Sequence, residues 1–238
     1  VFLNAANSVI FNQGAANGLV ASANVTITAG SQVIDQSAGN DVVASRLSIT
    51  AANGIGNGNA IDTAGVANLT LSNSVGGNVQ VTNNAGVNLD SASIAGNLVL
   101  STSGAITQSG TVDVSGNANF SAGTGNITLG VGTNNFGTLT FNGGTVAIVE
   151  NSDTQLTGTN ATSGNLTLTS TGNISETGAG TVSLAVAGNA NFQATAGNVT
   201  LTNAGAHNFG TLTFNSGVVQ IVENSDTQLT GTNATSGN

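Results

Sequence analysis

Residues 136–165 read FGTLTFNGGTVAIVENSDTQLTGTNATSGN, and residues 209–238 repeat this stretch with changes at only three positions. A looser match of residues 116–141 to residues 188–214 extends the repeat upstream, which gives a period of roughly 73 residues. A long internal period is typical of architectures in which one unit stacks on the next. We therefore expect a single continuous array over residues 1–238, with its long repeat at 116–165 and 188–238.

Short runs of alternating apolar and polar residues recur along the whole chain. Examples are ANVTITA (23–29), GNLVLS (96–101), GNITLG (125–130) and GNLTLTS (164–170). Alternation with a period of two predicts a strand with one buried face. The runs are separated by Gly, Asn and Ser, which suit tight turns. No stretch shows an apolar period of 3.6 residues, so the sequence predicts an all-β protein.

Two all-β architectures fit such a chain: a sandwich or barrel, and a parallel β-helix. The strands are short and nearly identical in pattern, and Asn-Gly hairpin signals are few. The long repeat also divides into about three coils of 24 residues, a common size for a β-helix. These features favour a right-handed parallel β-helix, a β-solenoid, of roughly ten coils of about 24 residues.

In a β-solenoid, one coil buries its inward side chains against the coils above and below it. We expect the inward residues to stack on their equivalents in the repeat, Phe120 with Phe192 and Phe141 with Phe214. The complete set of expected stacking residues is Phe120, Phe192, Phe141, Phe214, Leu139, Leu212, Ile148 and Ile221. Proline would remove a donor from the hydrogen-bond ladder, and the chain contains none.

The composition excludes several classes of function. Ten acidic residues stand against one arginine, Arg46, and the net charge is −9. Nucleic-acid binding needs clusters of Lys and Arg, so we expect no nucleic-acid partner. No apolar run is long enough to span a bilayer, so we expect no membrane insertion. The lack of Lys and the single Arg leave trypsin almost nothing to cut, which suits an extracellular protein. The first residue, Val1, and the lack of a signal peptide predict a piece of a longer protein.

The acidic tetrapeptide ENSD and its copy are the candidate site. Glu150 with Asp153, and Glu223 with Asp226, could bind Ca²⁺ weakly or act as an acid–base pair. The favoured interpretation is a solvated turn whose acids keep the rod soluble, because an enzyme rarely needs identical sites on successive repeats. We therefore expect no enzymatic activity and no cofactor apart from possible weak Ca²⁺.

Two further polar features have simple interpretations. His207 occupies the place of Asn134 or Asn135 in the earlier repeat, which predicts an interchangeable turn residue, and Arg46 reads as a lone outward charge. Thr-x-Thr pairs such as Thr26/Thr28 could bind ice if they formed a flat array. Their spacing along the sequence predicts instead that they are scattered over different faces.

The runs GNITLG, NFGTLTF, VAIVENSDTQLTGTN and GNLTLTSTGNISETG resemble the repeats of large bacterial exoproteins related to filamentous haemagglutinin. The resemblance covers residues 65–238 well and the first third by composition alone. It implies a right-handed β-helix in a surface-bound or secreted adhesin. The Pro-containing secretion domain of such proteins is missing here, which favours an internal shaft segment.

Together these observations predict a structural or adhesive fibre on a bacterial surface or in extracellular matrix. Expected partners are further covalent repeats or a second copy stacked head to tail, and host or matrix glycans or proteins. Two alternatives stay open: a glycan-binding or glycan-degrading β-helix, and an ice-binding β-solenoid.

Overall fold

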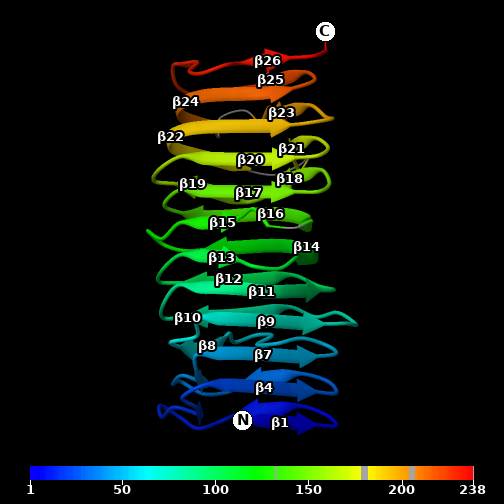
Figure 1. Cartoon of the computed structure of the whole chain (residues 1–238), viewed down its shortest axis with the longest axis vertical. Coiled ribbons are helices and arrows are strands. Elements are labelled where there is room, and N and C mark those ends of the chain that lie inside the picture. Colours follow the sequence, from blue (N-terminus) through cyan, green and yellow to red (C-terminus); the bar gives the residue numbers. More distant parts are fainter. Residues whose placement is uncertain (132, 178–181, 204–206, 238) are drawn as a thin grey trace.

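A computed structural model of the chain describes residues 1–131, 133–177, 182–203 and 207–237. Within these residues every regular element is a β-strand, and the strands stack as rungs of one long rod (Figure 1). No helix long and apolar enough to cross a bilayer occurs in this part of the chain. The predicted all-β parallel β-helix is confirmed, with about 11 turns.

The described residues form 26 strands. They are β1 (Phe2–Ala5), β2 (Val9–Phe11), β3 (Leu19–Val20), β4 (Asn24–Ala29), β5 (Val33–Asp35), β6 (Val42–Val43), β7 (Arg46–Ala51), β8 (Ile61–Ala64), β9 (Asn68–Asn73), β10 (Val79–Asn83), β11 (Val87–Ile94), β12 (Leu98–Thr102), β13 (Ile106–Gln108), β14 (Val112–Ser121), β15 (Ile127–Leu129), β16 (Asn135–Gly143), β17 (Val146–Glu150), β18 (Thr154–Leu156), β19 (Thr159–Thr162), β20 (Leu166–Ser170), β21 (Ile174–Glu176), β22 (Ser183–Ala194), β23 (Val199–Leu201), β24 (His207–Ser216), β25 (Val219–Ile221) and β26 (Ala234–Thr235).

Strand pairing is parallel throughout, so each strand lies directly above its counterpart in the preceding turn. Val25, Leu47, Leu69 and Leu89 form one inward column, and neighbours in this column are 22, 22 and 20 positions apart. Turns are therefore somewhat shorter and more numerous than the roughly ten coils of 24 residues expected. In Figure 1 the front strands run left to right as the chain climbs from N to C, the sense of a right-handed coil.

The predicted stacking residues lie in the core, but their partners differ from those expected. Phe120 pairs with Phe141 in the next turn, and Phe192 pairs with Phe214. Phe120, Phe141 and Phe192 are fully buried, as are Leu139 and Ile148, with Leu212 also buried; Phe214 and Ile221 are partly buried and pack against the same core. The Phe residues thus stack within one repeat, on successive turns.

Over the length of one long repeat, the chain makes three full turns of the coil and then continues along one further side. From Asn142, three turns lead through Ala161 and Ala185 to Asn208. The repeat equivalent of Asn142 is Asn215, which lies further along β24, beyond the register shift that carries β22 and β24 onto the next side. The expected division into about three coils of 24 residues therefore falls somewhat short of the turns that one repeat makes, because these turns are shorter than a third of the period. Equivalent surfaces in successive repeats face different directions.

The recurring Gly-Asn dipeptides link successive turns at the corners of the coil. The Asn97 Oδ1 atom accepts a hydrogen bond from the backbone N–H of Asn117 in the next turn, at 2.8 Å. Asn126, Asn165 and Asn173 do the same for the turns above them. A Cβ atom at Gly116 would collide with the Asn97 side chain, so glycine permits the close approach that this bond requires.

Candidate functional site

The structure places Glu150 inside the rod, where the sequence predicted a solvated turn. Its side chain is 1% exposed at the end of β17. Glu150 Oε1 accepts hydrogen bonds from the Phe136 N–H at 2.9 Å and from the Ser152 hydroxyl at 3.2 Å. Glu150 Oε2 accepts one from the Thr154 hydroxyl at 2.8 Å. Both carboxylate oxygens are therefore already bonded within the chain, and the solvated-turn prediction was wrong for this residue.

The copy of this site at Glu223 repeats the same three bonds. Glu223 accepts from the Phe209 N–H, the Ser225 hydroxyl and the Thr227 hydroxyl at 2.8, 2.9 and 2.8 Å. Phe136 and Phe209 are equivalent residues, so the carboxylate joins the same two segments in each repeat. This shared geometry explains why the tetrapeptide is copied: the acid supplies acceptors for a backbone N–H that the parallel ladder leaves free.

Asp153 faces away from this arrangement. It is exposed, and its Oδ1 accepts from the Asn173 N–H at 2.7 Å, whereas Asp226 lies on the exposed last turn. No group of three or more His, Cys, Asp or Glu residues with metal-site geometry occurs among the described residues. Weak Ca²⁺ binding by Glu150, Asp153, Glu223 and Asp226 stays a prediction.

His207 and its repeat equivalent Asn134 are both interior residues, which corrects the prediction of a turn position. His207 is fully buried, with Nε2 2.9 Å from Glu176 Oε1 and its ring stacked on Phe209. Asn134 is also fully buried and exchanges two hydrogen bonds with Gln108, at 2.8 and 2.9 Å. The repeat thus keeps a polar group at this corner of the core and places it against a second polar side chain each time.

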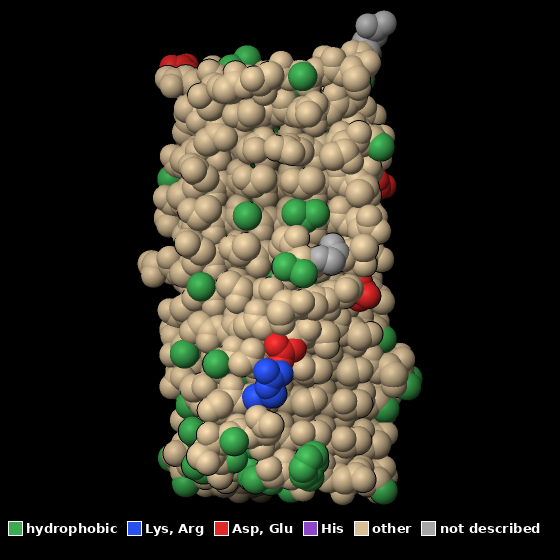
Figure 2. Space-filling model, viewed as in Figure 1, with side chains coloured by type: hydrophobic (Ala, Val, Ile, Leu, Met, Phe, Trp, Pro, Cys, Tyr) green, Lys and Arg blue, Asp and Glu red, His purple; other side chains and the backbone are tan. Residues whose placement is uncertain are grey.

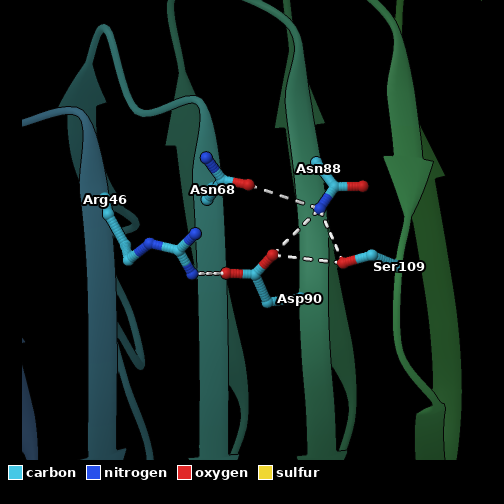
Figure 3. A network of polar contacts seen from close by, with 5 residues as sticks. All are labelled: Arg46, Asn68, Asn88, Asp90 and Ser109. Atoms are coloured by element: carbon cyan, nitrogen blue, oxygen red, sulfur yellow. Dashed lines mark hydrogen bonds and ion pairs between the residues drawn. The ribbon is translucent and has the colours of Figure 1, made fainter.

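Arg46 points outward, as expected, but it is not alone. Its guanidinium forms an ion pair with Asp90, two rungs further along the rod. Asp90 Oδ1 also accepts hydrogen bonds from the Asn88 amide at 3.0 Å and the Ser109 hydroxyl at 3.2 Å. Figure 3 shows these side chains meeting across neighbouring strands, with Asn68 between them. The pair is solvent-exposed, so it adds little stability.

A hollow on the described surface runs along β16, β19, β22 and β24. This groove has a volume of about 550 Å³ and is lined mostly by small residues, among them Asn142 and Ala161. Their repeat equivalents Asn215 and Ala234 line a second hollow of about 180 Å³. The two hollows share these two equivalent positions and differ in their other lining residues.

A second buried acid cluster lies in the first turns of the rod. Asp41 is fully buried, and its carboxylate accepts hydrogen bonds from the Ser37 hydroxyl at 2.8 Å, the Asp62 N–H at 2.9 Å and the Gln13 amide at 3.2 Å. Burial raises the pKa of Asp41 to about 6, and the nearby charge of Asp35 adds to the rise. Sequence reasoning missed this cluster, since its members are scattered along four separate segments.

We expect the protein to become more stable as the pH falls from 7 toward 4.5. The folded-state pKa of Asp41 lies above its unfolded value of 3.8, so the folded state binds the proton more tightly between these pH values. Burial also raises the pKa of Asp62 and of Glu150, which acts in the same direction. The gain attributable to Asp41 is about 2 kcal/mol. Urea unfolding at pH 7 and at pH 4.5 measures this gain in stability. Asp41→Asn should remove most of the gain that Asp41 contributes. An equal gain in the variant would contradict the assignment of the pH dependence to Asp41.

Comparison with known proteins gives a match to one family and to no individual protein. The sequence matches the family described as "Repeats of unknown function (DUF5649)" over residues 76–141 and 143–236, together about two thirds of the chain. Among curated proteins and among solved structures nothing matches.

Proposed function

We propose, from the premise that the chain belongs to the DUF5649 family of repeats, that it is a structural shaft segment of a bacterial surface or secreted fibre. The rod would hold a distal binding region away from the cell or form the body of a filament. Three features support this proposal: the continuous parallel stack, the long repeat, and the resemblance to filamentous-haemagglutinin-like exoproteins. The near absence of Lys and Arg adds resistance to trypsin-like proteases.

One observation carries the proposal: the same sequence occurs both covered and uncovered by a further turn. Leu156 is fully buried because the turn containing Glu176 lies above it. Its repeat equivalent Leu229 pairs with Leu212 below and, with no described turn above it, is 59% exposed. The apolar side chains of one turn are therefore buried by the turn that follows, as stacked repeats require.

Further repeats in the same chain, or a second copy stacked head to tail, are the partners that suit this parallel stacking. Each repeat makes three full turns and one further side of the coil. In a longer array, equivalent surface residues of successive repeats would therefore lie on successive sides of the rod. Such an array would favour polyvalent contacts with host or matrix glycans or proteins. An extracellular location belongs to the same proposal.

The extension of the rod can be tested with the chain's own sequence. A copy of residues 166–238 placed after Asn238 would follow the ENSDTQLTGTNATSGN segment just as Leu166 follows Asn165. We expect the longest dimension, measured by small-angle X-ray scattering, to grow by about 16 Å for three and a third added turns. The thermal midpoint should rise, since the present last turn becomes covered.

A matched control is the same extension with Asp at the copied positions of Leu166 and Leu168, which are inward and buried in the original. This extension should stay unfolded and leave the thermal midpoint unchanged. If the unaltered extension also scatters as a disordered tail, the shaft proposal fails.

A further inference from the structure

Eight hydroxyl side chains form a compact array on the front of the rod. They lie at the outward positions of four successive rungs, β4, β7, β9 and β11, in two adjacent columns. The first column is Thr26, Ser48, Thr70 and Ser91, and the second is Thr28, Thr50, Ser72 and Ser93. All eight are exposed or partly exposed. We call these eight residues the hydroxyl array.

The hydroxyls of the array are not engaged within the protein. None of the eight side chains forms a hydrogen bond with another described residue, whereas Thr138 and Thr140 both donate to Asn117 Oδ1, at 3.0 and 3.3 Å. Their equivalents Thr211 and Thr213 donate to Asn189 Oδ1 in the same way. The hydroxyl pairs are therefore of two kinds. One kind is hydrogen-bonded to an asparagine side chain, and the other is free to bind a ligand outside the rod.

The array stands on regularly paired strands with few charges near it: Arg46 and Asp90 lie beside it, and Asp113 pairs with Ser93 in the next rung. β4, β7 and β9 pair over six residues each without a register shift, and the pairing of β9 with β11 shifts by one residue between Leu89 and Ser91. Behind them, Ile27 and Ile49 are fully buried and Leu71 is 1% exposed. Figure 2 shows this face almost free of charge, with a single basic patch lying against an acidic one. That patch is the Arg46–Asp90 pair, whose two charges oppose each other beside the array.

We propose that the hydroxyl array binds the surface of ice. Parallel strands place its hydroxyls about 4.8 Å apart along the rod and about 6.7 Å apart along each strand. Oxygen repeats on the faces of hexagonal ice fall near these two distances, so one rigid array can meet many lattice waters at once. Its side chains are already ordered by the strands, so docking costs little conformational entropy. Searching for strict Thr-x-Thr spacing missed the array, because serine replaces threonine at half of its positions.

The test measures thermal hysteresis and inhibition of ice recrystallisation by the full chain. We expect activity in the unaltered protein and its loss in Thr50→Lys, which puts a long charged side chain in the middle of the array. The matched control is Thr169→Lys, an outward threonine on β20 whose vertical neighbours are Val149 and Gln193 rather than hydroxyl residues. Circular dichroism and the thermal midpoint establish that both variants remain folded.

Retention of activity in Thr169→Lys together with its loss in Thr50→Lys supports the proposal. The absence of hysteresis in the unaltered protein overturns it, as does equal loss in both variants. Binding to crystalline cellulose or chitin that Thr50→Lys abolishes, without any effect on ice, also overturns it and assigns the array to polysaccharide. The rod extension tested above does not depend on any of these outcomes.

Discussion

Replacing Phe141 by alanine lowers the free energy of unfolding by about 3–5 kcal/mol in our expectation, the largest effect of any single change considered. The side chain is fully buried and pairs with Phe120 in the turn below. Above it, the Asn160 Oδ1 atom accepts a hydrogen bond from the Phe141 N–H at 3.0 Å. With a turn on each side, the cavity left by the missing ring cannot collapse, so the full cavity cost remains. Urea unfolding followed by circular dichroism measures the change.

Phe214 provides a matched control because it lies in the same local sequence, TLTFN, one repeat later. It pairs with Phe192 below, but only the exposed last turn lies above it, and its side chain is partly buried. We expect Phe214→Ala to cost about half as much or less, since the last turn can relax or unfold locally. Equal costs for the two substitutions would contradict the idea that each turn is stabilised by the turn above it.

Much of the fold could be predicted because the alternation of apolar and polar residues, which indicates a strand, is visible within a few consecutive residues. The run ANVTITA gave β4 (Asn24–Ala29), and GNLVLS gave β12 (Leu98–Thr102), each within one or two residues of the observed strand. The parallel arrangement followed from the similarity of the runs and from the long repeat. Both features depend on residues that lie close together or recur at a fixed distance.

The relation between the repeat and the turns could not be predicted in the same way. Turn length varies with the number of residues at each corner: Asn142 and Ala161 are 19 positions apart, whereas Thr159 and Ser183 are 24 apart. Corner residues have no periodic pattern of their own. The offset of one side per repeat therefore becomes visible only in the strand register, and with it the true stacking partners of Phe120 and Phe192.

The candidate sites depended even more on tertiary contacts. Glu150 was assigned to a solvated turn because acids next to Asn and Ser usually are, yet Phe136 presents a free N–H to it from another part of the turn. The Asp41 cluster and the hydroxyl array each collect residues from several turns. No short sequence motif predicts these two clusters, because their members come together only in the folded coil.

Replacing Glu150 by alanine should lower the free energy of unfolding by about 2–3 kcal/mol, because it leaves the buried Phe136 N–H without a partner. Glu150→Gln should cost less than about 1 kcal/mol, since the amide oxygen can still accept that bond and no buried charge has to be accommodated. Glu223→Ala is the positional control: the same three bonds are lost, but on the exposed last turn, where water can replace them.

The pH dependence of stability gives a second test of the role of the Glu150 carboxylate. Burial raises the pKa of Glu150, so the folded state binds its proton more readily than the unfolded state, and this contribution to stability grows as the pH falls. Glu150→Gln should therefore compare less favourably with the unaltered protein at pH 4.5 than at pH 7, because more of the unaltered carboxyl is protonated at the lower pH. Urea midpoints of the three variants at both pH values provide the measurement. If alanine and glutamine at position 150 prove equally costly, the acceptor role of the carboxylate is wrong, and the copied ENSD segment would need a different physical reason.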